Sequence, residues 1–170
     1  GSENVSDKNK QMPETKKLGV DLSGQVAVVT GASQGLGRSI AETLAANGAV
    51  VALVARNAEK LSGVASAIQE AGGQAEVFPC DVTKPESIGE VIESIVEKLG
   101  RLDILVNNVG AWFETRQETK ERIEKTFALN HLSYVALTHE VLPLMEKSET
   151  KKIINVASQA HRYAHLDRND

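Results

Sequence analysis

Five short apolar runs alternate with segments of helical periodicity along this chain of 170 residues. Residues 26–30 lack the polar alternation of half-exposed strands, which is typical of a strand buried on both faces of a parallel sheet, and form the first of these runs. The five runs occupy residues 26–30, 50–54, 75–78, 104–106 and 153–156. Because strand and helix alternate throughout, we expect an α/β fold with a doubly wound parallel sheet in three α/β/α layers. Ligands of such sheets bind at the carboxyl ends of the strands.

Between the runs, apolar residues recur at helical spacing, which predicts three helices that end at Gly48, at Gly72-Gly73 and at Gly100. Glycine suits these ends because it adopts the left-handed conformation without steric cost. The apolar stripes are Leu36, Ile40, Leu44 with Ala41 and Ala45; Leu61, Val64, Ala65 and Ile68; and Ile88, Val91, Ile92, Ile95 and Leu99.

Two further expectations concern the third helix and the last helical region. Thr83 and Glu86 have the spacing of a capping box at the start of the third helix. A helical region is expected over about residues 119–147, with a break near Asn130.

Composition excludes several classes of protein. With 41% apolar and 25% charged residues, the chain is expected to form one globular domain. Its net charge of −4 provides no broad positive field, so we expect no nucleic-acid partner. No apolar stretch approaches the roughly 20 residues of a membrane span, so we expect no membrane association. Cys80 is the single cysteine, which argues against a disulfide or a cysteine zinc cluster and favours a cytoplasmic location.

The polar N-terminal segment differs from the rest of the chain. Residues 1–21 contain too few apolar groups to offset the entropy of ordering, so we expect a disordered arm. We interpret Gly1 and Ser2 as the remnant of an expression tag. The globular domain is then expected over residues 22–170.

The segment at residues 30–37, Thr-Gly-Ala-Ser-Gln-Gly-Leu-Gly, joins the first expected strand to the first expected helix. Glycines let the backbone turn sharply and approach a ligand, and the N–H groups and positive dipole end of a helix start attract a pyrophosphate. We therefore predict a dinucleotide-binding loop in a Rossmann-type domain; the alternative is a tight turn without a ligand. The candidate cofactor contacts are Thr30, Gly31, Ser33, Gln34, Gly35, Leu36 and Gly37.

Further motifs follow in order along the chain: Asp81-Val82, Asn107-Asn108-Val109-Gly110, Asn130 and Ser158. Together with the glycine spacing, they resemble the short-chain dehydrogenase/reductase family over about residues 22–158. The resemblance implies that Asp81 and Val82 contact adenine. It also implies that Asn107, Asn108 and Gly110 lie at the cofactor, in a signature that has valine where the family has alanine.

The end of the second expected strand bears on cofactor choice. In NAD-binding domains of this type, an acidic residue about 20 positions past the glycine loop accepts a hydrogen bond from the ribose 2′-hydroxyl. Here the residues are Ala55, Arg56 and Asn57. Because Arg56 offers a planar fork to phosphate oxygens and no carboxylate repels them, we predict NADP(H) as the cofactor. The alternative is a solvated arginine beside a helix start, and Gln34 stands where some NADP-preferring relatives carry a basic residue.

The resemblance also implies a mechanism. In this family, nicotinamide supplies a hydride to a carbonyl, and a tyrosine whose pKa is lowered by a lysine supplies the proton. Ser158 would orient the substrate oxygen and donate to the developing alkoxide. Asn130 would extend a proton relay. The alternatives are a capping serine and an asparagine at a helix kink.

The tyrosine and lysine of that mechanism are not found in the sequence. The family's Tyr-x-x-x-Lys lies farther beyond the serine than Asp170, where this sequence stops. Tyr163 comes soon after Ser158, and Asp167 would raise its pKa, so we interpret Tyr163 as a loop residue. We therefore expect the 170 residues alone to be inactive, the sheet to be incomplete at its C-terminal edge, and the natural protein to continue.

Two residue pairs carry weaker signals. His161 and His165 have the spacing of metal ligands, but no acidic third ligand is near, so we expect a solvated loop and no metal. Trp112 and Phe113 would line a substrate pocket or pack in the core.

These features predict an NADP(H)-dependent oxidoreductase that interconverts a carbonyl and an alcohol in a small-molecule substrate by hydride transfer, and that forms a homo-oligomer. The alternative is a catalytically silent dinucleotide-binding or interaction module, which uses the same glycine loop without chemistry.

Overall fold

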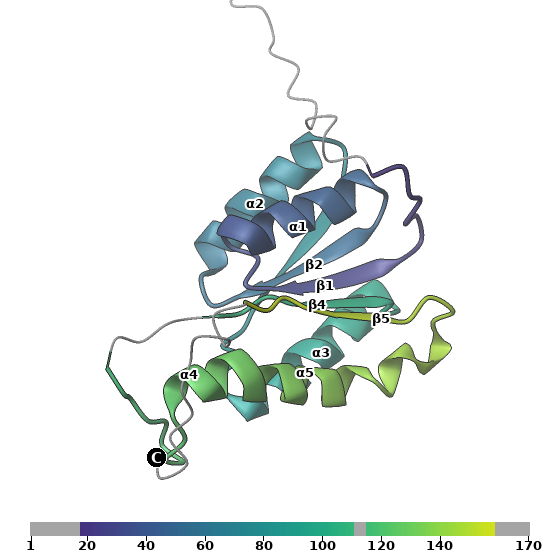
Figure 1. The fold of residues 1–170 in the computed structure, drawn as a ribbon. Helices are drawn as coiled ribbons and strands as arrows, with labels where there is room; N and C mark the ends of the chain where they lie inside the picture. The colour runs from purple at the N-terminus through teal and green to yellow at the C-terminus, as the bar shows by residue number, and fades with distance from the viewer. Residues whose placement is uncertain (1–17, 111–114, 159–170) are drawn as a thin grey trace, which may run out of the picture.

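The computed structural model describes residues 18–110 and 115–158. Five parallel strands of these residues form one sheet in the order β3-β2-β1-β4-β5 (Figure 1). The order reverses at β1, as in the doubly wound, Rossmann-type sheet that the sequence predicts. The strands are β1 Val26–Thr30, β2 Val50–Ala55, β3 Gln74–Pro79, β4 Ile104–Asn107 and β5 Lys152–Asn155.

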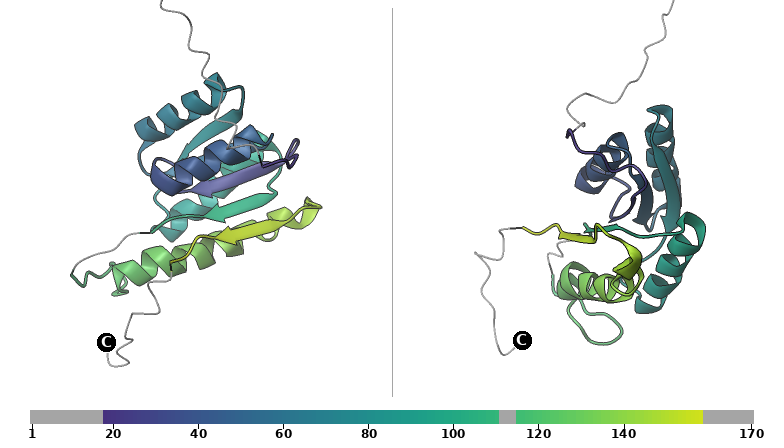
Figure 2. Two further views of the ribbon diagram at one scale, coloured as in Figure 1. Left: turned by 45° about the horizontal axis from the view of Figure 1, so that its top comes forward. Right: turned by 90° about the vertical axis from the view of Figure 1, so that its right-hand side faces the viewer.

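Helices cover both faces of the sheet and complete the three layers (Figures 1 and 2). Helices α1 (Gly35–Ala46) and α2 (Ala58–Glu70) pack on one face, and α3 (Pro85–Leu99) and α5 (Ser133–Val141) pack on the other. Successive side chains of a strand point to opposite faces. The continuous apolar run of β1 therefore serves both layers.

The predicted apolar stripes of α2 and α3 are buried, apart from the partly buried Leu99, but Leu36 in α1 is exposed. Leu36 has 58% of its surface exposed. The buried side of α1 consists of Gly37, Ala41 and Ala45. These small residues let the helix lie close to the sheet, which leaves the bulkier Leu36 at the solvent side of the helix start.

The predicted capping box at α3 is wrong. The helix begins at Pro85 with Lys84 as its N-cap, one residue later than a cap at Thr83 would require. Proline disfavours the helical conformation in the residue before it, so Lys84 stays extended and Glu86 has no cap to complete. The Thr83 hydroxyl instead donates to Asp81 Oδ1 at 2.6 Å.

The last helical region begins later than predicted. It starts with α4 (Lys125–Phe127), where the Glu124 carboxylate accepts hydrogen bonds from two backbone N–H groups at 2.8 and 2.7 Å. A π-helical turn, Ala128–Leu132, connects α4 to α5, so the predicted break near Asn130 is a widened turn. A 3₁₀ turn at Leu144–Lys147 follows α5.

Strand β5 differs from the central strands in its burial. All five residues of β1 are buried, whereas β5 is mostly exposed, with 46% of Ile154 accessible to solvent. Within the described residues β5 pairs with β4 alone. This edge of the described sheet therefore presents an apolar side chain to solvent.

Candidate cofactor and catalytic site

The loops after β1 and β4 pack against each other at backbone distance. A Cβ atom on Gly31 would lie 1.9 Å from the Asn108 carbonyl oxygen, and a Cβ atom on Gly37 would lie 2.1 Å from the Gly31 carbonyl oxygen. Gly31 also has a φ of 62°, in the region that favours glycine. Both positions therefore require glycine for the loops to meet.

The Thr30 hydroxyl joins the same two loops. Its Oγ1 donates to the Val106 carbonyl oxygen at 3.3 Å and accepts from the Asn108 N–H at 2.9 Å. Thr30 is fully buried, so loss of its hydroxyl would leave buried polar groups without partners. Thr30 thus fixes the position of the glycine loop from inside the protein.

The start of α1 is open to an anion. Neither a capping side chain nor an acidic residue occupies its first turn. Gly35 begins the helix with no atom within 4 Å of the place where its Cβ would lie. Ser33 is half-buried beside it, and Gln34 and Leu36 are exposed. Because first-turn N–H groups lack acceptors within the helix and the dipole adds positive charge, these residues fit a pyrophosphate.

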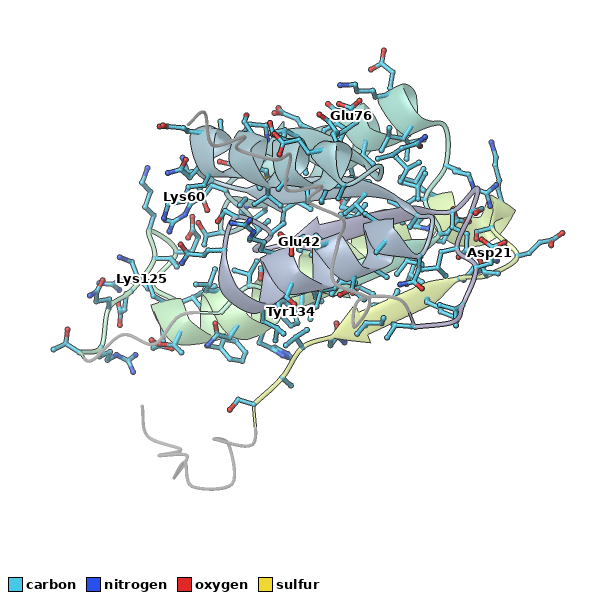
Figure 3. All side chains as sticks on the ribbon, turned by 90° about the horizontal axis from the view of Figure 1, so that it is seen from above. Asp21, Glu42, Lys60, Glu76, Lys125 and Tyr134 are labelled. Carbon is cyan, nitrogen blue, oxygen red and sulfur yellow. The ribbon has the colours of Figure 1, made fainter. Side chains whose placement is uncertain are left out.

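Two cationic side chains follow β2, one directly after the strand and one in the first turn of α2. Arg56 is exposed and has no ion-pair or hydrogen-bond partner within the described residues. Lys60 Nζ donates to Gln34 Oε1 at 3.0 Å. In Figure 3, Lys60 lies at the opposite end of the molecule from Asp21, which precedes β1.

Lys60 is absent from the set of site residues that the sequence predicts. Its place follows from Asn57, whose side chain caps α2 by accepting from the Lys60 N–H at 2.9 Å. The cap fixes where α2 begins, and the fold brings α2 beside Gln34. A lysine three residues after a recognisable N-cap is the local signal that points to it.

The turn after β3 brings Asp81 close to the end of β2. The Cys80 N–H donates to the Ala55 carbonyl oxygen at 2.9 Å and extends the ladder between these strands. Asp81 Oδ1 accepts from the Thr83 N–H at 3.0 Å, which shapes the turn. Val82 is buried among the side chains under α3.

Asn107 ends β4 with an unusual buried acceptor. Its Nδ2 donates to Asn155 Oδ1 at 2.8 Å, at the end of β5. Its Oδ1 is buried and has no hydrogen-bond partner within the described residues. Because an unpaired buried acceptor costs free energy, a donor placed here would stabilise this end of the sheet.

The predicted catalytic residues also lie at the carboxyl ends of the strands. Asn130, in the π-helical turn, is adjacent to Gly110, since a Cβ atom on Gly110 would lie 3.5 Å from Asn130 Oδ1. Ser158 is exposed and follows the carboxyl end of β5. Because the strands are parallel, the glycine loop, the loop after β4 and the segment after β5 all lie at the carboxyl ends of the strands.

Tyr134 connects two of these segments and is not among the site residues that the sequence predicts. Its hydroxyl accepts from the Val109 N–H at 3.1 Å and lies 2.9 Å from the Val109 and 3.1 Å from the Val156 carbonyl oxygens, to which it can donate. Burial raises the pKa of Tyr134, against the opposing effect of its backbone hydrogen bond at Val109. No local pattern marks this role, because the partners are 25 and 22 residues away.

Several predicted features lie outside the described residues, namely Trp112, Phe113, His161, Tyr163, His165 and Asp167. In the part of the chain that is described, no group of three or more His, Cys, Asp and Glu side chains could hold a metal ion. Among the same residues, no helix combines the length and the apolar surface needed to cross a membrane.

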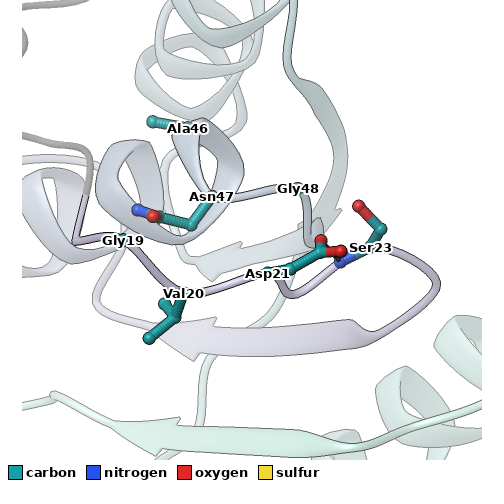
Figure 4. A pocket seen from close by; sticks show the side chains of 7 residues that line it. All are labelled: Gly19, Val20, Asp21, Ser23, Ala46, Asn47 and Gly48. Atoms are coloured by element: carbon teal, nitrogen blue, oxygen red, sulfur yellow. Dashed lines mark hydrogen bonds between the residues drawn. The ribbon is translucent and has the colours of Figure 1, made fainter.

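A separate hollow lies at the opposite end of the sheet. It has a volume of about 400 Å³ and forms where the segment before β1 passes the C-terminal end of α1 (Figure 4). Asn47 holds that segment, because its Oδ1 accepts from the Leu18 N–H at 2.9 Å and its carbonyl oxygen accepts from the Leu22 N–H at 2.8 Å. The hollow is therefore a product of chain anchoring, remote from the glycine loop.

Comparisons with known proteins agree with this arrangement. Residues 25–167 match the short chain dehydrogenase family. The chain is 40% identical to the fatty acyl-CoA reductase of Acinetobacter baylyi over 142 residues, which cover 81% of this chain and 48% of that protein. A metagenomic short-chain oxidoreductase in complex with NADP has a TM-score of 0.75 and 39% identity, covering 82% of this chain and 64% of that one.

A second solved structure, 7α-hydroxysteroid dehydrogenase complexed with NADH and 7-oxo glycochenodeoxycholic acid, also has a TM-score of 0.75. It is 32% identical and covers 93% of this chain and 62% of that one. The chain spans about half the length of the curated relatives it matches. With its glycine loop, its sheet order and its match over residues 25–167, the chain belongs to the short-chain dehydrogenase family.

Proposed function

We propose that this chain is the nucleotide-binding part of an NADP(H)-dependent oxidoreductase that interconverts a carbonyl and an alcohol in a small-molecule substrate. Family membership supports the class of reaction. The observation that carries the cofactor choice is exposed Arg56 at the end of β2, which has no partner within the described residues. A guanidinium there suits phosphate oxygens, whereas NAD is favoured by a carboxylate at this place.

The residues at the carboxyl ends of the strands would each bind a different part of the cofactor. The glycine loop and the start of α1 would hold the pyrophosphate, and Asp81 and Val82 would contact the adenine. Asn107, Asn108 and Gly110 would line the cofactor at the end of β4. One similar structure contains NADP and another contains NADH, so the residues at the end of β2 would decide the preference.

The chemistry would take place beside the segment after β5. Bound NADP(H) would supply or accept the hydride. The Ser158 hydroxyl would donate to the oxygen on which negative charge develops, and Asn130 would support a proton relay. The reaction also needs a proton donor with a pKa near the working pH. Tyr134 does not meet this need, because burial raises its pKa and backbone groups occupy its hydroxyl. We infer that the 170 residues alone turn over no carbonyl.

The proposal is tested by titrating the chain with NADPH and with NADH and following cofactor fluorescence. NADPH is expected to bind more tightly, and Arg56→Ala is expected to weaken NADPH binding about tenfold or more without changing NADH binding, because a charge-assisted hydrogen bond contributes about 1.5 to 3 kcal/mol. Lys151→Ala is the control, because it removes an exposed positive charge before β5, at the other end of the sheet.

Equal affinity for the two cofactors, or unchanged NADPH affinity in Arg56→Ala, contradicts the proposed preference. A longer protein that contains this chain and binds NADPH but reduces none of a broad panel of carbonyl compounds would favour a silent binding module instead.

A further inference from the structure

The glycine loop of this chain contains no basic side chain that is free to meet a phosphate. Residues 30–37 include neither lysine nor arginine. The next residue, Arg38, donates from Nε to the Glu42 carboxylate at 2.8 Å, so its charge is already paired. A second cation for a phosphorylated cofactor would therefore have to come from another element.

Lys60 of α2 is the cation that the fold brings to this loop. Its Nζ lies 3.0 Å from Oε1 of Gln34, the residue immediately before α1. Gln34 is a neutral partner, so the bond orients the ammonium group and leaves its charge unneutralised. Lys98 shows the contrast, because its Nζ lies 2.7 Å from the Glu76 carboxylate.

The stability of α2 does not account for a cation at this position. Lys60 lies in the first turn of α2, where the helix dipole favours negative charge and disfavours positive charge. Glu59 in the same turn suits the dipole, but Lys60 does not. A cation that is unfavourable to its own helix and is held by a neutral amide is better explained by an anion that it would meet.

We propose that Lys60 is a second specificity-determining cation for the 2′-phosphate of NADP(H), with Gln34 as the residue that positions it. The inference rests on the proposed function, and it adds a residue from α2 to the contribution of Arg56. The two side chains act differently, because a guanidinium binds phosphate oxygens as a planar fork and an ammonium acts as a compact point charge.

The experiment separates the 2′-phosphate from the rest of the cofactor. Adenosine 2′,5′-bisphosphate and adenosine 5′-monophosphate are titrated by calorimetry into the 170-residue chain, Lys60→Gln, Lys60→Arg, Gln34→Glu and the control Lys151→Gln. Lys60→Gln is expected to weaken the bisphosphate about 5- to 10-fold and to leave the monophosphate unchanged, as suits one partly solvated charged contact.

The other variants sharpen the expected result. Lys60→Arg should retain most of the preference for the bisphosphate, because it keeps the charge. Gln34→Glu should reduce that preference further than Lys60→Gln, because its carboxylate would pair with Lys60 and repel the phosphate. The melting temperature of Lys60→Gln should be unchanged or slightly raised, since a positive charge leaves the helix start.

Two failures can be told apart. If the unmodified chain binds both adenosine phosphates equally, the proposed NADP(H) preference is wrong and the role of Lys60 is wrong with it. If the unmodified chain prefers the bisphosphate and Lys60→Gln keeps that preference, or weakens both ligands equally, the role of Lys60 alone is overturned.

Discussion

The two ends of the sheet are held by different chemistry. At the amino ends of the strands, the buried Asp103 carboxylate accepts hydrogen bonds from the Val26 N–H at 2.8 Å, from Arg101 at 2.7 and 2.8 Å, and from the Ser148 hydroxyl. At the carboxyl ends, neutral groups connect neighbouring segments by hydrogen bonds. An example is the Thr30 hydroxyl, which joins β1 to the loop after β4. The charged groups at the amino ends bind one another, whereas the neutral groups at the carboxyl ends surround the candidate site.

This difference follows from what each end must accommodate. A buried ion is tolerated only where donors satisfy it, and Asp103 has donors from three segments of the chain. A carboxylate fixed beside the glycine loop would repel the phosphates of a cofactor, and Asp81, the carboxylate after β3, is instead held within its own turn by Thr83. Hydroxyl and amide groups hold the loops there without adding charge, so the helix start and the cations near β2 determine which anion is attracted.

The largest expected effect comes from breaking the charged end. Asp103→Ala should lower the free energy of unfolding by about 3 kcal/mol, because Val26 and Ser148 lose a buried partner. Urea unfolding measures this loss. Glu76→Ala is the matched control, because it removes an exposed ion pair with Lys98 and should cost less than about 1 kcal/mol. Similar losses in the two variants would show that burial of the carboxylate is unimportant.

A methyl group at the neutral end tests its close backbone contact. Gly37→Ala should lower the free energy of unfolding by about 2 kcal/mol, because its Cβ would lie 2.1 Å from the Gly31 carbonyl oxygen. Gly63→Ala in α2 meets no atom within 4 Å and should stabilise the protein by about 0.5 to 1 kcal/mol. Thermal unfolding distinguishes the two, and a tolerated Gly37→Ala would contradict the packing described for these loops.

Removing one hydroxyl should have a smaller, local effect. Tyr134→Phe keeps the ring and should cost about 1 kcal/mol, because the Val109 N–H loses its acceptor. Hydrogen exchange should show faster exchange at the Val109 amide. The amides of Val26 and Asp103 at the other end should be unaffected. Unchanged protection at Val109 would mean that Tyr134 does not hold this loop.

The charged end should also respond to acid, with little effect near neutral pH. Burial opposes ionisation of Asp103, but hydrogen bonds from Arg101, Ser148 and Val26, with the Arg101 charge, outweigh it and lower the pKa of Asp103. Its stabilising effect should therefore be complete above the ordinary carboxyl pKa of about 4 and be lost as the pH falls through the lower folded-state value. Urea midpoints should fall less steeply in acid for Asp103→Asn, and equally steep curves would contradict this role.

The sequence predicts the regular elements well because their signals are local. The run at β1 has no polar residue to interrupt it before Thr30, and the α3 stripe from Ile88 to Ile95 leaves one orientation for the helix. The capping box failed because Pro85 restricts Lys84, an effect of one neighbour that the spacing of Thr83 and Glu86 does not contain.

The site was less predictable because its contacts are long-range. Motif spacing places Thr30, Asn107 and Asn130 on elements that meet at the carboxyl ends of the strands. It does not show that Lys60 reaches Gln34, 26 residues away, or that Tyr134 reaches Val156. Those contacts depend on where α2 and α5 lie against the sheet, which periodicity alone does not specify.

The strand order also affects the order in which this protein can be built during synthesis. β1 lies between β2 and β4, and the Thr30 hydroxyl bonds to a carbonyl oxygen 76 residues later in the chain. A ribosome that adds about 5 to 20 residues per second needs about 4 to 15 s to make that length. During this time β1 can pair with β2 but not with β4. The backbone hydrogen-bonding groups on one side of the fully buried strand β1 therefore have no strand partner until β4 has been translated.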